Sequence, residues 1–137
     1  MPRGLTMKLN HIDLQVPDVQ RTAAFFERYF GFEHTSNRAS PAIAILEDGA
    51  GLVLVLQRLK RPEEKYPEGF HVGFLVDAVE TVLAFHARAL ADGLEVSEVI
   101  RNNRGTMVYC QAPGAVLVEV NARPVRARDS VGVGRVD

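Results

Sequence analysis

Apolar and polar residues alternate along residues 9–16, and this alternation predicts a β-strand with two unlike faces. One face is apolar, whereas the other is polar and consists of His11, Asp13 and Gln15. A strand with one polar face is typical of an antiparallel or mixed sheet, because a sheet covered on both sides is apolar throughout. Pro17 ends the strand, and Asp18 is a favourable N-cap for a following helix.

Apolar residues at helical spacing follow directly and predict a helix over residues 19–30. Gly31 is the expected C-terminal stop of this helix. Three short strands are predicted next, at residues 32–36, 42–46 and 52–57. The first part of the chain therefore has the order strand, helix and three strands.

The second part of the chain repeats this order after a polar, proline-containing connection at residues 60–69. Asp77 is the expected N-cap of the second helix, and residues 101–105 are expected to form a polar loop. The pattern predicts a first strand, a helix and three further strands, at residues 70–76, 79–90, 94–100, 106–110 and 115–120. Repetition of so large a unit indicates an internal duplication, and two such units either set their open faces together or form a concave cup for a ligand.

The predicted fold class is α+β, with two βαβββ modules forming a cupped mixed sheet with helices on the outer face. We expect a single domain at residues 7–122, in which module one spans 7–59 and module two spans 69–122. Residues 123–137 combine Pro, Arg, Asp and Gly without a long periodic pattern, so a mostly irregular tail is expected there.

Composition narrows the class of function. The chain has 137 residues, 47% of them hydrophobic, with a net charge of −1 and a pI near 6.4. This charge gives no reason to expect binding to nucleic acid or to an anionic membrane surface. A single cysteine, Cys110, fits a reducing compartment, and we expect a cytoplasmic protein with a small-molecule substrate.

Three segments together resemble the vicinal oxygen chelate superfamily, the glyoxalase, bleomycin resistance protein and extradiol dioxygenase group, which also includes fosfomycin-resistance proteins. They are L-N-H-I-D-L-Q-V-P-D-V at 9–19, F-H-V-G-F-L-V-D-A-V at 70–79 and G-A-V-L-V-E-V at 114–120. The resemblance extends over nearly all of the expected domain. It is specific for the fold and much less so for the reaction, because the group hosts several chemistries and some proteins that only bind.

The resemblance implies a metal ion held by residues of the first and last strands of each module. The residues at these places are His11, His71 and Glu119, and counting five residues from the preceding glycine assigns the fourth place to Leu56. Leucine cannot coordinate a metal, so a three-ligand site for a divalent ion (Fe, Mn, Zn or Ni) is expected. The chemistry of Glu119 is consistent with this, because a lone carboxylate between two valines is costly to bury unless a metal, a basic partner or solvent compensates it.

Other polar residues have two interpretations each. Asp13 and Gln15 either contact substrate and support a histidine ligand, or form an ordinary solvated strand face. Asn103 and Arg104 either hold substrate or belong to a loop that is polar for no functional reason. Tyr109 either donates a proton beside Glu119, the other candidate catalytic residue, or packs in the core.

The sequence predicts a metal-dependent enzyme of the vicinal oxygen chelate type, acting on a small oxygenated substrate and forming a homodimer. The lyase, dioxygenase and thiol-transfer branches all remain open. The alternative is a metal-free drug- or metabolite-binding protein like the bleomycin resistance proteins, and a third possibility is a dimerising domain without a small-molecule role.

Overall fold

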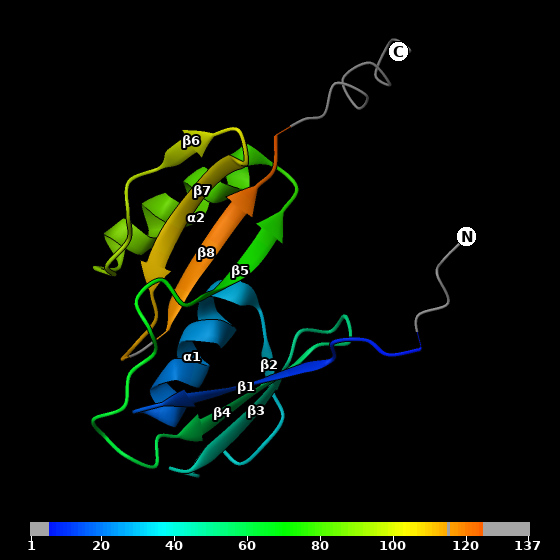
Figure 1. Ribbon diagram of the computed structural model, residues 1–137, viewed down its shortest axis with the longest axis vertical. Coiled ribbons are helices and arrows are strands. Elements are labelled where there is room, and N and C mark those ends of the chain that lie inside the picture. The colour runs from blue at the N-terminus through cyan, green and yellow to red at the C-terminus, as the bar shows by residue number, and fades with distance from the viewer. Residues whose placement is uncertain (1–5, 115, 125–137) are drawn as a thin grey trace. The chain divides into compact units, whose positions relative to one another are not determined.

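The computed structural model describes residues 6–114 and 116–124 (Figure 1). The chain divides into two compact units, each with one helix and one four-stranded mixed sheet. Unit one lies within Met1–Glu68 and Ala112–Val116, and unit two lies within Gly69–Gln111 and Leu117–Asp137. Each unit has the order strand, helix and three strands, so the predicted α+β fold with two βαβββ modules is confirmed.

Unit one is a mixed sheet covered by one helix. Its strands lie in the order β1-β4-β3-β2, with β1 parallel to β4 and the other neighbours antiparallel. Helix α1 packs on β2, β3 and β4. The elements are β1 (His11–Val16), α1 (Val19–Phe30), β2 (Glu33–His34), β3 (Ile43–Glu47) and β4 (Val53–Arg58).

Local sequence determines where α1 begins and ends. The carboxylate of Asp18 accepts a hydrogen bond from the backbone N–H of Arg21 at 3.2 Å, so the predicted N-cap is confirmed. Gly31 adopts the left-handed conformation with φ 70°, which satisfies the last carbonyls of the helix at little steric cost. The helix then buries Phe26 against the apolar face of the sheet, where Leu14 and Leu56 are also buried.

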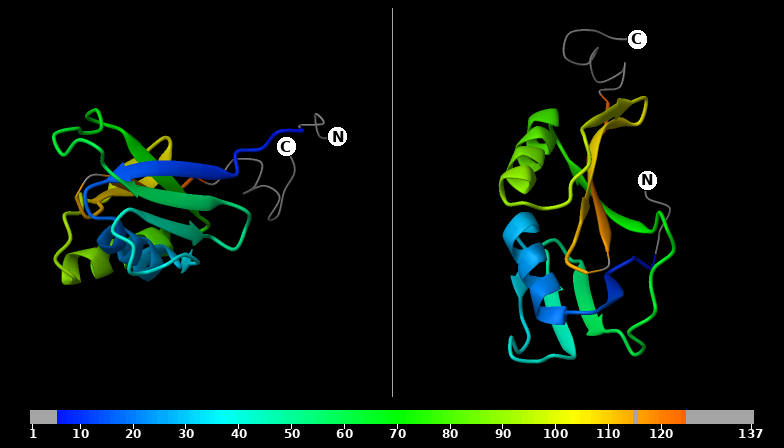
Figure 2. Two further views of the ribbon diagram at one scale, coloured as in Figure 1. Left: turned by 90° about the horizontal axis from the view of Figure 1, so that it is seen from below. Right: turned by 90° about the vertical axis from the view of Figure 1, so that its left-hand side faces the viewer.

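Unit two repeats this arrangement. Its strands lie in the order β5-β8-β7-β6, with β5 parallel to β8, and helix α2 packs on β5, β7 and β8. Figure 2 shows each helix along one face of its own sheet, which leaves the other face of each sheet without a helix. The elements are β5 (His71–Val76), α2 (Val79–Ala91), β6 (Ile100–Asn102), β7 (Gly105–Gln111) and β8 (Leu117–Ala122).

Two local predictions in unit two were wrong. The N-cap of α2 is Ala78 rather than Asp77, and Ala78 makes no side-chain cap, because the helix begins one residue further along than the acidic residue implies. Residues 94–99 form only an isolated bridge at Val96, and strand β6 (Ile100–Asn102) instead includes two residues that were expected in a polar loop. Pairing with β7 provides hydrogen-bond partners for this exposed segment despite its polar composition.

The predicted tail at 123–137 lies outside the described residues, except for Arg123 and Pro124. None of the helices among the described residues is long and apolar enough to cross a membrane.

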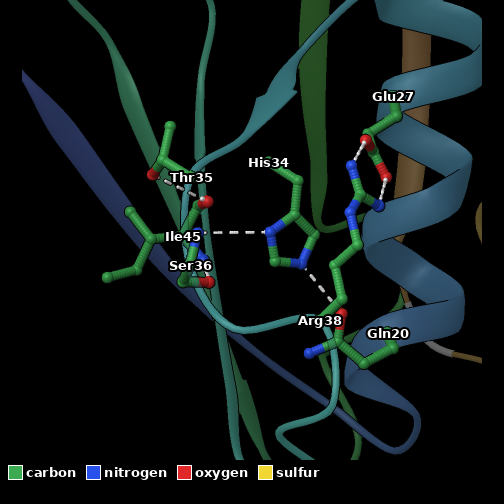
Figure 3. Close-up of polar contacts among 7 residues, drawn as sticks. All are labelled: Gln20, Glu27, His34, Thr35, Ser36, Arg38 and Ile45. Atoms are coloured by element: carbon green, nitrogen blue, oxygen red, sulfur yellow. Dashed lines mark hydrogen bonds and ion pairs between the residues drawn. The ribbon is translucent and has the colours of Figure 1, made fainter.

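In unit one, side chains fasten the loop at residues 35–42 to helix α1 (Figure 3). Nδ1 of His34 accepts from the N–H of Ser36 at 3.3 Å, so its Nε2 donates to Oε1 of Gln20 at 2.9 Å. The amide nitrogen of Gln20 in turn donates to the carbonyl oxygen of Ser40 at 2.7 Å. Glu27 and Arg38 form a two-point ion pair nearby, at 2.7 and 3.0 Å, which lowers the pKa of the Glu27 carboxyl.

We expect Gln20→Ala to lower the free energy of unfolding by about 1–2 kcal/mol, because it removes partners from partly buried polar groups. Arg61→Ala is the control, since its ion pair with Glu64 is exposed and should contribute nothing measurable. Urea denaturation of both variants measures the difference. Equal stability of the two variants would contradict the role of Gln20.

Candidate functional site

The parallel pairing of the first and last strands of unit two brings His71 and Glu119 together. Register pairs His71 with Leu117 and Gly73 with Glu119, so the histidine and the carboxylate lie on neighbouring strands. Nε2 of His71 is 3.1 Å from Oε1 of Glu119. Two donors that each bind one metal at about 2.1 Å and at a right angle stand about 3 Å apart, so this spacing suits a shared ion.

A backbone carbonyl fixes the orientation of the His71 ring. Nδ1 of His71 lies 2.8 Å from the carbonyl oxygen of Gly69, which can only accept, so Nδ1 carries the proton. Nε2 therefore faces Glu119 either with its lone pair or, if the ring is charged, with a second proton. Orientation of a ligand histidine by a carbonyl is the usual support at metal centres.

Glu119 is a mostly covered carboxylate with several hydrogen-bond donors. Its side chain is 14% exposed, and Oε2 accepts from Nδ2 of Asn121 at 2.9 Å. Tyr109 pairs with Glu119 across β7 and β8 and hydrogen-bonds to its carboxylate. Burial, and next this hydrogen bond and the carboxylate charge, raise the pKa of Tyr109, so its hydroxyl keeps its proton at neutral pH. The Tyr109 ring also meets the His71 ring edge to face, with centroids 5.5 Å apart.

Asn121 is a site residue that the sequence analysis did not identify. Its Nδ2 faces Glu119, while its Oδ1 is buried without a hydrogen-bond partner among the described residues. An unsatisfied buried oxygen costs about 1–3 kcal/mol, so the amide is oriented for the carboxylate and not for stability. The alternation of β8, which places residue 121 on the face of residue 119, was the signal that could have revealed it.

Unit one carries the second predicted histidine and a polar network beside it. Nδ1 of His11 lies 2.8 Å from Oδ1 of Asn10, which leaves Nε2 available as the free donor atom. On the same face, the carboxylate of Asp13 accepts hydrogen bonds from the amides of Gln15, at 3.0 Å, and Gln57. The structure thus brings Asp13 and Gln15 together and adds Gln57, whose position in the last strand gave no signal in the sequence.

The assignment of Leu56 as the counterpart of Glu119 was wrong. Leu56 is fully buried and pairs with Leu14. Asp13, two residues after His11, pairs with Val55, and Gly73, two residues after His71, pairs with Glu119. The counterpart of Glu119 is therefore Val55. The turn before the last strand is the cause: the partner of the histidine follows the turn glycine by two residues in unit one (Gly51 to Val53), and by three in unit two (Gly114 to Leu117). Valine cannot coordinate a metal either, so unit one still lacks a carboxylate at this place.

The remaining candidates differ in their surroundings. Asn103 and Arg104 form the exposed turn between β6 and β7, where Oδ1 of Asn102 accepts from the N–H of Arg104 at 2.8 Å. The positive charge of Arg104 partly opposes the rise in the pKa of Tyr109, so the guanidinium lies within electrostatic range of that phenol. Cys110 is buried, as predicted, and burial raises the pKa of its thiol to about 11, which leaves it protonated and unreactive.

The residues present fit a metal ion in part. His71 and Glu119 supply two donor atoms in unit two that face one another. His11 supplies an imidazole in unit one, and its Nδ1, like that of His71, lies 2.8 Å from an oxygen, so Nε2 is left as the donor atom. Within the described part of the chain, no three His, Cys, Asp or Glu side chains gather into a group that could hold a metal. The donor set nevertheless has the right chemistry, because two imidazoles and one carboxylate suit Fe, Mn or Zn.

Comparison with solved structures gives similar folds. A possible glyoxalase from Bacillus cereus is 34% identical, with a TM-score of 0.76 over 85% of this chain and 99% of that one. The fosfomycin resistance protein FosX from Listeria monocytogenes is 23% identical, with a TM-score of 0.72 over 88% and 97%. Lactoylglutathione lyase from Agrobacterium tumefaciens is 19% identical, with a TM-score of 0.67 over 88% and 96%.

Comparison with curated proteins gives no match. The family model of the Glyoxalase/Bleomycin resistance protein/Dioxygenase superfamily, in contrast, matches residues 8–120, which include His11, His71, Glu119, all nine helices and strands from β1 to β7, and most of β8. The resemblance expected from the three sequence segments is therefore confirmed. The chain belongs to the Glyoxalase/Bleomycin resistance protein/Dioxygenase superfamily.

Proposed function

We propose that the chain is a divalent-metal-dependent enzyme that acts on a small oxygenated substrate. The observation that carries the proposal is the pair formed by His71 and Glu119, in which Nε2 lies 3.1 Å from the carboxylate while Nδ1 is held by a backbone carbonyl. A histidine oriented in this way beside a mostly covered carboxylate is the arrangement that a metal ion requires.

His11, His71 and Glu119 are the proposed ligands of one ion, which is Fe, Mn, Zn or Ni. Three protein donors leave coordination positions open, and an ion bound there polarises a substrate oxygen as a Lewis acid. A related FosX structure from Listeria monocytogenes is a complex with Mn(II) and 1S,2S-dihydroxypropylphosphonic acid, which supports a metal and an oxygen-rich small molecule for this fold. His11 belongs to unit one, whereas His71 and Glu119 belong to unit two.

Tyr109 is the proposed proton donor, with Glu119 as its neighbour. Its raised pKa keeps the phenol protonated at neutral pH, so it can donate a hydrogen bond or a proton to an oxygen that gains negative charge. Glu119 accepts the hydrogen bond of Tyr109 before substrate arrives, and this contact keeps the phenol directed toward the site.

Four polar residues are the proposed substrate contacts. Asp13 and Gln15 lie on the face of β1 that carries His11, and their mutual hydrogen bond at 3.0 Å limits the rotamers available to them. Asn103 and Arg104 are exposed in the turn between β6 and β7, and the charge of Arg104 acts on Tyr109. The lyase, dioxygenase and thiol-transfer branches stay open, and a cytoplasmic location remains our expectation.

A metal-free binding protein is the second candidate, and one observation favours it. Glu119 already accepts from Asn121 and Tyr109, and it pairs with His71 if that ring is protonated, so the carboxylate does not need an ion to be satisfied. Metal content separates this candidate from the enzyme.

Purified protein reconstituted with Mn²⁺ or Zn²⁺ should hold about one equivalent of metal, as expected for one three-ligand site. We expect Glu119→Ala to weaken metal binding by more than the roughly 10–100-fold that supporting residues contribute, because it removes a ligand. Glu98→Ala is the control, since this glutamate is exposed and is not the partner of His71. Elemental analysis of the dialysed proteins gives the result, and wild-type protein that retains no metal would rule out the proposed enzyme.

Asn121→Val should leave the free energy of unfolding unchanged or raise it, because the unsatisfied buried Oδ1 disappears and valine favours a strand. Metal affinity should nevertheless fall by about 10–100-fold, since Glu119 loses the donor that orients it. Leu117→Val, on the same face of β8, is the control, and it should leave both the metal affinity and the free energy of unfolding close to the wild-type values. If Asn121→Val instead destabilises the fold and binds metal normally, Asn121 supports only the structure.

A further inference from the structure

Gly73 stands in the middle of β5, where glycine has no evident structural purpose. The φ angle of Gly73 is not positive, so any residue can adopt its backbone conformation. A Cβ built on Gly73 would meet nothing within 4 Å, so close packing does not require glycine either. Since glycine weakens the interior of a strand, its presence at this position needs another explanation.

Gly105 differs from Gly73 both in its backbone conformation and in the space around it. Gly105 has φ 132°, and a Cβ there would lie 2.3 Å from the carbonyl oxygen of Ala122, so the fold demands glycine at that position. Glycine at 73 has neither of these reasons. What it does leave is open space directly opposite Glu119, its register partner on β8.

This space is part of a pocket in unit two, with a volume of ≈ 170 Å³ and an open mouth. The side chain of Leu75, which is 62% exposed, forms an apolar wall, while Glu119 and Asn121 form the polar floor. Arg123 supplies a positive charge at the pocket and makes no ion pair with any carboxylate in the described residues. The pocket therefore offers room for a few heavy atoms beside a cation.

Unit one fills the corresponding place. Asp13 occupies the position two residues after the first-strand histidine, as Gly73 does in unit two, and its register partner is Val55. The Asp13 side chain is tied to Gln15 and Gln57, so it occupies the room that unit two leaves empty. The two units thus differ at this pair of positions, with Asp13 beside Val55 in unit one and Gly73 beside Glu119 in unit two, and only unit two keeps space next to the carboxylate.

We propose that Gly73 keeps this pocket open for a small oxyanion of the substrate, a carboxylate or similar group, which Arg123 attracts while Glu119 binds the metal. The inference rests on the proposed function, because the metal offsets the negative charge of Glu119 that would otherwise repel an anion. Gly73 determines which substrates fit, since any side chain at this position reaches into the pocket.

The test uses glycolate as the probe and the NMR amide signals of residues 73–75 as the readout, with the full chain in its metal-free and Zn²⁺-loaded forms. We expect glycolate to shift these signals in the zinc form, and uncharged glycolamide to do so more weakly. Gly73→Val should weaken glycolate binding at least about tenfold, with Gly73→Ala in between, because added carbon groups in a fitted pocket change affinity by about 10–200-fold. Arg123→Gln should reduce the preference for glycolate over glycolamide.

Val72→Ile is the matched control, because it adds bulk to β5 on the face opposite Gly73. Gly73→Val must also keep the urea midpoint, the oligomeric state and the zinc content of the wild type. Unchanged glycolate binding in Gly73→Val would overturn the proposal, and so would a loss of stability or a changed oligomeric state, since the space would then belong to a protein neighbour.

Failure of the proposed function gives a different result. If the wild type takes up no zinc, the metal-dependent enzyme is excluded, and the metal-free titration then decides the pocket. Glycolate binding to this metal-free protein that still depends on Gly73 would support the pocket without the metal. If the protein takes up neither zinc nor glycolate, both proposals fall, whereas a zinc-loaded wild type that does not bind glycolate would overturn the pocket alone.

Discussion

The parallel pairing of the first strand with the last strand is the constraint on which each unit depends. It places residues far apart in the sequence, His71 and Glu119, on adjacent strands with their side chains 3.1 Å apart. Parallel neighbours need a long crossover, and in both units the helix and the two intervening strands provide it. The helix covers one face of the sheet, so the candidate site residues lie on the other face.

The fold could be predicted from the amino-acid sequence because its apolar residues recur with a clear period in most strands and helices. Alternation in β1 and β5, the cap at Asp18 and the stop at Gly31 each follow from local chemistry, and the structure confirms them. The errors fell where local chemistry is ambiguous. Residues 94–100 contain apolar residues and residues 101–105 are polar, so the local pattern favours the first stretch, but pairing with β7 places the strand across the boundary between the two.

The candidate site was predictable only as far as the residue types that metals prefer. Histidine and glutamate stand out in apolar strands, whereas Asn121, Gln57 and the carbonyl of Gly69 gain their importance from contacts with residues distant in sequence. The error at Leu56 has a similar origin, since a one-residue difference in turn length moves every later side chain to the opposite face. Counting residues from the turn glycine does not detect that difference, whereas the pairing register of the strands in the structure does.

The two units show how a duplicated framework becomes asymmetric at a site. Unit two has a glycine on β5 and a carboxylate on β8, whereas unit one has the carboxylate on β1 and a valine on β4. Asp13 accepts from two glutamine amides, whereas Glu119 accepts from Asn121 and also faces a histidine nitrogen, so only Glu119 has beside it a second donor of a kind that metals prefer. The two units keep the same strand order and pairing, so the proposed difference between a hydrogen-bonding face in unit one and a metal-binding face in unit two comes from which strand carries the carboxylate and which side chains surround it.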